Sequence, residues 1–219
     1  MTAMKYKAVL WDMDGVLIDS ERHWDSLGDL FLEDVVTDWD AFDKTRLVGR
    51  SLRDIYNLFQ DEYGIAITFE EYVEEYNKLA KFIYQNKAEL LPHAISTLTE
   101  IQNAGTTQGL VSSSSHMWIE YALKRFPLRQ FFDVIVSSDD VDGVGKPDPA
   151  IYTFACNQIG VPPDQAIVVE DSTPGITAAR EAGSTVIGFD HQDNIQDLAG
   201  ADIFISDLEE IPEILFSAG

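Results

Sequence analysis

Two aspartates follow a short apolar run near the start of the chain. Residues 8–11 are apolar and partly β-branched, which is typical of a buried strand in a parallel sheet. Asp12 and Asp14 come directly after this run, and Gly15 allows the backbone to turn sharply. Residues two apart on an extended chain point the same way, so both carboxylates face one crevice and need a cation or a shared proton. The spacing favours a divalent metal site with chemistry over a solvated polar loop.

Three later segments repeat this pattern of an apolar run that ends in polar residues. Residues 108–111 lead into a run of four serines that starts at Ser112, and residues 166–169 lead into Glu170 and Asp171. Hydroxyls and free N–H groups at a strand end can bind an anion, although a serine-rich turn with Ser115 capping a helix explains the same residues. Ligands of open α/β sheets bind beyond the carboxyl ends of strands, where these residues are predicted to lie.

The third of these segments, residues 132–136, is followed by several acids and then by Lys146. This lysine lies in a turn that neighbouring glycine and proline residues restrict, with Asp148 and Pro149 predicted to start the next helix. A solvated loop lysine is the alternative to a lysine that offsets the charge of a bound anion.

Strands and helices alternate through most of the chain, which predicts an α/β fold with a doubly wound, mostly parallel sheet. Residues 20–91 are different, because their apolar spacing is helical and no strand is expected there. Ser20 is expected to cap the first of these helices, and capping-box patterns begin at Ser51 and Thr68. The predicted domains are therefore a core of residues 1–19 and 92–219 and a helical insert of residues 20–91.

Composition and charge restrict the partners of the protein. The 219 residues carry a formal net charge of −23, which disfavours nucleic acid and anionic membranes as partners. No apolar run approaches the length needed to span a membrane. Cys156 is the one cysteine, so no internal disulfide forms, and we expect a buried thiol and a cytoplasmic location.

The segment Asp12-Met13-Asp14-Gly15-Val16-Leu17-Ile18-Asp19-Ser20 resembles motif I of the haloacid dehalogenase superfamily of phosphotransferases. Ser112 falls on motif II of that superfamily, Gly145-Lys146-Pro147-Asp148-Pro149 resembles motif III, and Glu170-Asp171 resembles motif IV. The resemblance covers most of the chain. It implies a Rossmann-like core in which the helical insert is a type 1 cap that closes over the catalytic crevice.

The resemblance also implies roles for single residues. Asp12 is the expected nucleophile, which forms an aspartyl-phosphate, and Asp14 the expected general acid and base. The phosphate is expected to be held by Lys146, by the Ser112 hydroxyl and by the backbone N–H of Ser113. The expected Mg²⁺ ligands are Asp12, the backbone carbonyl of Asp14, and Asp171, with Glu170 in direct contact or one shell further out. The acids outnumber the lysine, so a phosphate dianion needs the cation as well as Lys146.

The insert carries the features that bear on substrate choice. Arg50 lies in a segment that resembles the cap's specificity loop, and either contacts a distal group of the substrate or is a solvated surface residue. Relatives of the β-phosphoglucomutase type have a histidine where this chain has Trp24, and an arginine where it has Leu52. Both differences weaken the prediction of a mutase.

Three functions remain in consideration. A phosphatase of small phosphorylated metabolites, with sugar phosphates as the expected class, leads; a phosphosugar mutase is second, and a non-catalytic phosphate-binding module is third. We expect a monomer or a weak dimer.

Overall fold

The structure is a computed structural model that describes residues 6–36, 46, 52–191 and 196–216. The chain divides into two compact units, of which one comprises residues 1–19 and 89–219 and the other residues 20–88. No helix among the described residues is long and apolar enough to cross a membrane.

The larger unit is built on a six-stranded sheet in the order β5-β4-β1-β6-β7-β8. Every neighbouring pair in this sheet is parallel. The strands are β1 (Ala8–Trp11), β4 (Thr107–Ser112), β5 (Val134–Ser137), β6 (Ala166–Glu170), β7 (Thr185–Phe189) and β8 (Ile203–Ile205). The central strand β1 is fully buried, as its continuous apolar run predicted.

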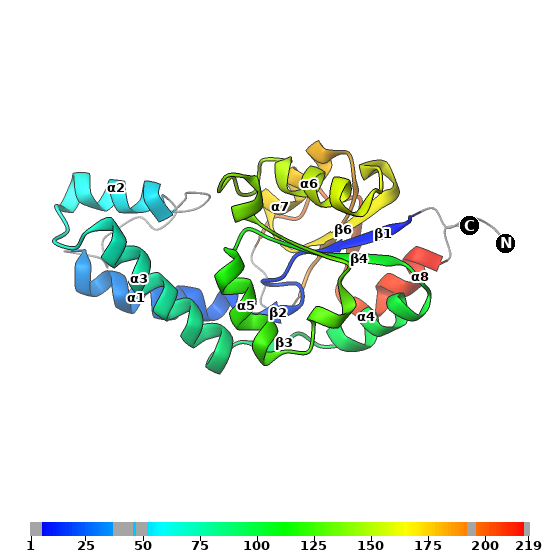
Figure 1. The fold of residues 1–219 in the computed structure, drawn as a ribbon, viewed down its shortest axis with the longest axis horizontal. Coiled ribbons are helices and arrows are strands. Elements are labelled where there is room, and N and C mark those ends of the chain that lie inside the picture. The colour runs from blue at the N-terminus through cyan, green and yellow to red at the C-terminus, as the bar shows by residue number, and fades with distance from the viewer. Residues whose placement is uncertain (1–5, 37–45, 47–51, 192–195, 217–219) are drawn as a thin grey trace. The chain divides into compact units, whose positions relative to one another are not determined.

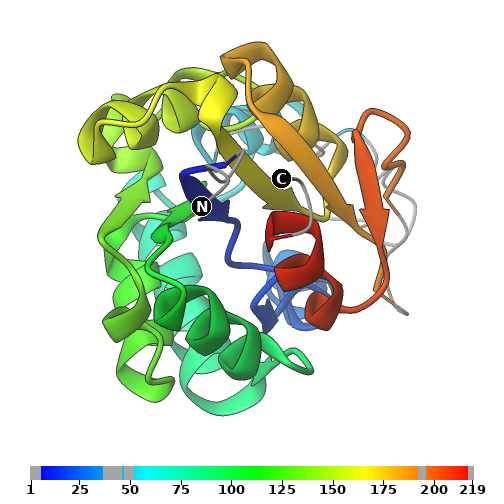
Figure 2. The same cartoon turned by 90° about the vertical axis from the view of Figure 1, so that its right-hand side faces the viewer.

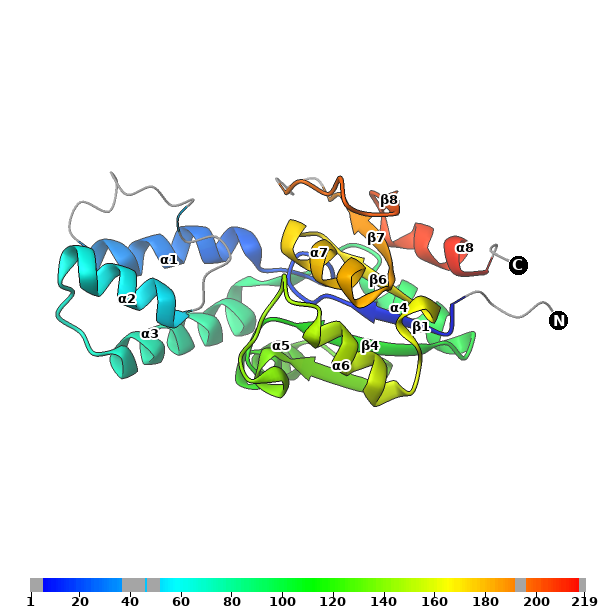
Figure 3. The same cartoon turned by 90° about the horizontal axis from the view of Figure 1, so that it is seen from above.

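Helices cover both faces of this sheet. They are α4 (Ala94–Asn103), α5 (His116–Arg125), α6 (Ala150–Ile159), α7 (Thr173–Ala182) and α8 (Ile211–Phe216), with short 3₁₀ helices η4 (Arg129–Phe131), η5 (Ser138–Val141), η6 (Pro163–Gln165) and η7 (Leu208–Glu210). Helices α6 and α7 lie on one face and α4, α5 and α8 on the other (Figures 1 and 3). Figure 2 shows α4 (green) and α8 (red) side by side. The predicted doubly wound α/β fold is confirmed.

The smaller unit is helical and has a core of its own. It contains α1 (Glu21–Val35), α2 (Leu52–Tyr63), α3 (Phe69–Phe82) and the π-helical segment η3 (Ile83–Lys87). The ring of Tyr72 is fully buried between those of Phe31, Tyr56 and Tyr76. The predicted capping box at Thr68 is present, since its hydroxyl accepts from the Glu71 N–H and its own N–H donates to the Glu71 carboxylate.

Several sequence-based boundaries were wrong. The expectation of no strand up to residue 91 fails, because β3 (Glu89–Leu90) pairs antiparallel with β2 (Ile18–Asp19). Strands of two residues are too short to produce an alternating pattern. Ser20 occupies the N-cap position of α1 without a capping bond from its side chain. Helix α6 has Pro149 as its N-cap residue, although Asp148 still accepts from the Ala150 N–H at 2.9 Å.

Candidate active site

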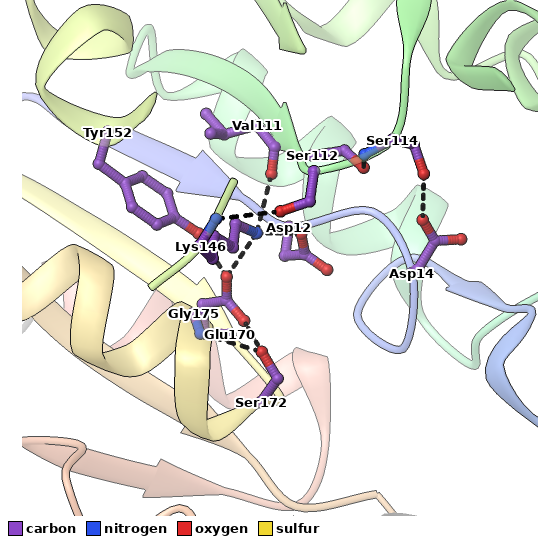
Figure 4. A network of polar contacts seen from close by, with 11 residues as sticks. Asp12, Asp14, Val111, Ser112, Ser114, Lys146, Tyr152, Glu170, Ser172 and Gly175 are labelled. Carbon is purple, nitrogen blue, oxygen red and sulfur yellow. Dashed lines mark hydrogen bonds and ion pairs between the residues drawn. The ribbon is translucent and has the colours of Figure 1, made fainter. Parts of the chain in front are cut away.

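The site lies where the strand order changes direction. Strand β1 has β4 on one side and β6 on the other. After β1 the chain adds β4 and β5 on one side, and it then crosses back to add β6 on the other side of β1. Asp12, Ser112 and Glu170 stand at the carboxyl ends of these three strands. Crevices at such switch points are where open α/β sheets bind ligands. Figure 4 shows these residues gathered at the strand ends.

Lys146 places its ammonium group between the carboxylates of Asp12 and Glu170. Its Nζ forms ion pairs with Asp12 and, at 2.6 Å, with Glu170, and it donates to the Val111 carbonyl at 3.2 Å. The Lys146 side chain is 7 % exposed, so its charge is compensated by these partners rather than by water. Burial lowers the pKa of Lys146, but the charges of Asp12 and Glu170 outweigh burial and raise it above the usual value. The ammonium therefore stays protonated.

Glu170 is held from several directions. Its Oε1 accepts from the Tyr152 hydroxyl at 2.5 Å as well as from Lys146, and its Oε2 accepts from the Ser172 hydroxyl at 3.0 Å. A Cβ on Gly175 would lie 2.0 Å from the Glu170 carboxylate, so only glycine leaves room for that group. Neither Tyr152 nor Ser172 was among the residues predicted for the site. Helical spacing predicted that Tyr152 is buried but carried no signal for its hydroxyl.

Three buried carboxylates form a group that fits a metal ion. Oxygens of Asp12, Glu170 and Asp171 all lie within 4.8 Å of one another. Burial raises the pKa of Asp12 well above its usual value; Lys146 opposes this, and the neighbouring carboxylates add to it. Burial likewise raises the pKa of Asp171, against the effect of His191. A cation among these oxygens would relieve the repulsion, and hard oxygen donors suit Mg²⁺.

The Asp171 carboxylate also depends on a glycine. Gly15 has φ of +80°, and a Cβ there would lie 2.0 Å from Asp171 Oδ2. The turn predicted at Gly15 thus serves two purposes, because it turns the backbone after β1 and leaves space for the carboxylate of Asp171, which directly follows β6.

Asp14 is set apart from the cluster around Asp12. It is half-buried, and its Oδ2 accepts from the Ser114 hydroxyl at 3.3 Å. Ser114 is itself fixed, because its N–H donates to the Ser112 hydroxyl at 3.1 Å and its carbonyl accepts from the Ser137 hydroxyl at 2.7 Å. Ser114 was not among the residues predicted for the site. Two carboxylates from one short motif therefore occupy different environments.

The remaining predicted residues are placed as follows. Ser112 is buried at the end of β4, and the exposed Ser113 accepts from the backbone N–H of Lys146 at 3.4 Å. Ser115 caps α5 by accepting from the Trp118 N–H, as the alternative interpretation of the serine run stated. Arg50, predicted to bind substrate, lies outside the described residues.

Comparisons with known proteins agree with this arrangement. The sequence profile of the haloacid dehalogenase-like hydrolases matches residues 9–189. The chain is 32 % identical to validoxylamine A 7'-phosphate phosphatase of Streptomyces hygroscopicus subsp. limoneus, over 94 % of this chain and 96 % of that protein. It is 28 % identical to a phosphorylated carbohydrates phosphatase of Thermotoga maritima, over 81 % of this chain and 82 % of that protein. A Thermotoga maritima crystal structure, named as a candidate beta-phosphoglucomutase, superimposes with a TM-score of 0.75 at 27 % identity, over 97 % of this chain and 100 % of that chain.

The chain belongs to the haloacid dehalogenase-like hydrolase family. Within that family, the phosphatase names of its relatives indicate a phosphoric monoester hydrolase. The family and the enzyme class predicted from the motifs are thereby confirmed.

Proposed function

We propose that this protein is a Mg²⁺-dependent phosphatase that hydrolyses a small sugar phosphate through an aspartyl-phosphate intermediate. The observation that carries the proposal is the buried pairing of Asp12 with Lys146 beside Glu170 and Asp171. A carboxylate held against a lysine at the carboxyl end of the central strand can serve as a nucleophile toward phosphorus. The names of two relatives, which act on a phosphorylated carbohydrate and on validoxylamine A 7'-phosphate, support a sugar-like substrate.

Asp12 and Asp14 would divide the chemistry between them. A carboxylate oxygen of Asp12 forms a bond to phosphorus while the ester bond to the leaving oxygen breaks, and Asp14 gives that oxygen its proton. A water molecule then loses a proton to Asp14 and attacks phosphorus, which releases inorganic phosphate and restores the Asp12 carboxylate. The separate environments of the two acids support this division, because Asp12 is buried and paired with the lysine, whereas Asp14 is half-buried and accepts from Ser114.

The transferred phosphoryl group would be held by donors from three segments. The Lys146 ammonium, the Ser112 hydroxyl and the Ser113 N–H would donate to the phosphoryl oxygens, on which negative charge develops. Asp12, Asp171 and the backbone carbonyl of Asp14 would hold Mg²⁺, with Glu170 in direct contact or one shell further out. When bound, the ion supplies positive charge that offsets the excess of carboxylates over lysine.

Residues 20–91 are proposed as the cap domain, with Arg50 as a residue that contacts a distal group of the substrate. A phosphosugar mutase is the second candidate, favoured by the similarity to the candidate beta-phosphoglucomutase and weakened by Trp24 and Leu52. The buried free thiol of Cys156 supports a reducing compartment such as the cytoplasm, and a monomer or weak dimer is proposed.

Phosphate release from a panel of sugar and nucleotide monophosphates tests the proposal. The wild type is expected to release phosphate with Mg²⁺ and not with EDTA, and Asp12→Asn is expected to release none. Full activity of Asp12→Asn would contradict the aspartyl-phosphate scheme. No release from any monophosphate, together with conversion of β-glucose 1-phosphate to glucose 6-phosphate in the presence of a bisphosphate primer, would favour the mutase instead.

A further inference from the structure

The Tyr152 hydroxyl is a buried polar group in the site that the proposed mechanism leaves without a role. Tyr152 lies on α6, its side chain is fully buried, and its hydroxyl donates to Glu170 Oε1 at 2.5 Å. The Lys146 Nζ lies 5.2 Å from the centre of the Tyr152 ring, within the range of a cation–π contact. The residue therefore touches both charged partners of one ion pair.

Packing alone does not explain a tyrosine at this position. A phenylalanine would place the same ring beside Lys146 and in the same apolar core, which includes Ile151, Ala155 and Val168. Burying a hydroxyl costs free energy unless the hydroxyl has a hydrogen-bond partner, and here that partner is Glu170. The hydroxyl is therefore explained by its hydrogen bond to Glu170 and not by packing.

Glu170 is the link between Tyr152 and the nucleophile. Its Oε1 accepts from Tyr152 and contacts the Lys146 ammonium, and that ammonium in turn pairs with Asp12. Ser172 holds the other oxygen of Glu170. Figure 4 shows Tyr152, Glu170, Lys146 and Asp12 in this order. Without the Tyr152 bond, the Glu170 carboxylate would be less restrained about its last torsion and could draw the ammonium away from Asp12.

We propose that Tyr152 is a positioning residue, which through Glu170 fixes the Lys146 ammonium against the nucleophilic Asp12. The proposal rests on the proposed phosphatase function for its effect on turnover, but the positioning itself is a property of the protein without substrate. Tyr152 does not touch the reacting atoms.

A double-mutant cycle on turnover of p-nitrophenyl phosphate tests this link. Tyr152→Phe is expected to lower kcat by roughly tenfold with an unchanged KM, because a hydrogen bond to a charged group is lost while the ring remains. In a Glu170→Gln background, Tyr152→Phe is expected to change kcat by less than about twofold, since residues that act through one another are not additive. Equal effects in both backgrounds, or an unchanged kcat, would overturn the proposal.

Tyr56→Phe is the matched control. The Tyr56 hydroxyl also donates one hydrogen bond, to the Ile67 carbonyl at 3.0 Å, but within the helical unit. Its loss is expected to leave kcat unchanged in both backgrounds. Thermal midpoints of all variants separate a fall in kcat from a fall in stability.

A second measurement reads the position of Lys146 without substrate or metal. In protein labelled with ¹⁵N-lysine, the buried Lys146 ammonium is expected to exchange slowly with water and is assigned by its loss in Lys146→Met. Tyr152→Phe is expected to shift this resonance and speed its exchange, and Tyr56→Phe to leave it unchanged. An unmoved resonance in Tyr152→Phe would contradict the inference. If Tyr152→Phe does not fold, 3-fluorotyrosine at position 152, which makes the hydroxyl more acidic and adds one fluorine to the ring, is expected to shift the same resonance.

These two measurements separate the inference from the proposed function. A wild type that releases no phosphate refutes the function and leaves the resonance test intact. An active wild type with an unmoved Lys146 resonance in Tyr152→Phe refutes the inference alone.

Discussion

Two clusters in the larger unit each place one basic side chain between two carboxylates. The first consists of Lys146 with Asp12 and Glu170, and the second of His93 with Asp207 and Glu209. Both clusters contain carboxylate groups close enough to share a cation. Their surroundings differ, because the side chain of Lys146 is 7 % exposed and that of His93 is 40 % exposed.

If the first cluster is the catalytic one, as proposed, the difference indicates that burial matters more than the kinds of residues in a charged cluster. At the strand ends, burial raises the pKa of Asp12 and keeps each charge dependent on its partners. At the surface, water screens the same kinds of charges, and exposed pairs contribute little to stability. The His93 cluster instead joins the start of α4 to the start of η7, segments that are far apart in sequence.

Removal of the buried Lys146 ammonium should have the largest effect on activity and stability. Lys146→Met is expected to lower kcat by roughly a hundred- to a thousandfold, because a preorganised charge is lost from a dry site. It should also destabilise the fold by about 3–5 kcal/mol, since buried carboxylates lose their partner. Steady-state kinetics and denaturant unfolding measure the two effects. Lys78→Met is the control, because Lys78 pairs with Glu74 and Glu75 at the surface, and it should change neither quantity.

A second variant fills the space beside the buried Glu170 carboxylate. Gly175→Ala would place a methyl group against Glu170 and is expected to destabilise the protein by about 1–3 kcal/mol, as overpacking does, and to lower kcat. Gly105→Ala is the control, since its φ is +77° and no atom lies within 4 Å of its Cβ position. That variant should lose stability through backbone strain and keep its kcat. Equal kcat values for the two variants would show that Glu170 tolerates displacement.

Activity should depend less on the contact of the half-buried Asp14 with Ser114 than on Lys146. Ser114→Ala removes the donor to Asp14 and is expected to lower kcat by roughly five- to tenfold, because a hydrogen bond that orients a charged group is lost. Ser96→Ala, which removes a surface bond to the His93 carbonyl, should leave kcat unchanged. A Ser114→Ala enzyme with wild-type kcat would mean that Asp14 needs no help from this hydroxyl.

The exposed cluster should affect only stability, and only over part of the pH range. The hydrogen bond to Asp207 raises the pKa of His93 in the folded protein. Protonated His93 therefore stabilises the fold fully at pH values below the pKa of histidine in the unfolded chain. This stabilisation is lost as the pH rises through the pKa of His93 in the folded protein. The pKa of Asp207 is lowered, first by the Glu209 N–H and then by His93, so its contribution is lost as pH falls toward the acid range.

His93→Asn tests this pH dependence, because asparagine tolerates the left-handed backbone of residue 93. The variant is expected to have a lower thermal midpoint than the wild type near about pH 5.5, below the usual histidine pKa, and a similar one at about pH 9. Its kcat/KM should match that of the wild type. A midpoint difference that persists at the higher pH would show that the contact does not depend on charge.

Prediction from sequence succeeded where apolar runs end abruptly in polar residues. That pattern located the end of β1 and, to within one residue, the ends of β4 and β6, because burial and the sheet edge both affect which residue types occur there. It failed for Tyr152 and Ser114, whose hydroxyls have partners 18 and 100 positions away, beyond the reach of a local pattern. The periodicity of apolar residues indicates which face of a helix or strand is buried, but not which group a side-chain hydroxyl binds. Strands β2 and β3 were missed because a pair of residues has no period.

The order of the strands has a further consequence for folding. Strands β4, β1 and β6 are neighbours in space, yet Asp12 and Asp171 are separated by most of the length of the chain. The unfolded chain would have to close a very long loop, with its entropy cost, to bring these acids together. An ion bound by them would therefore bind the native state almost exclusively, and by mass action it would raise the melting temperature. Chelation would then lower the melting temperature of the protein as well as its activity.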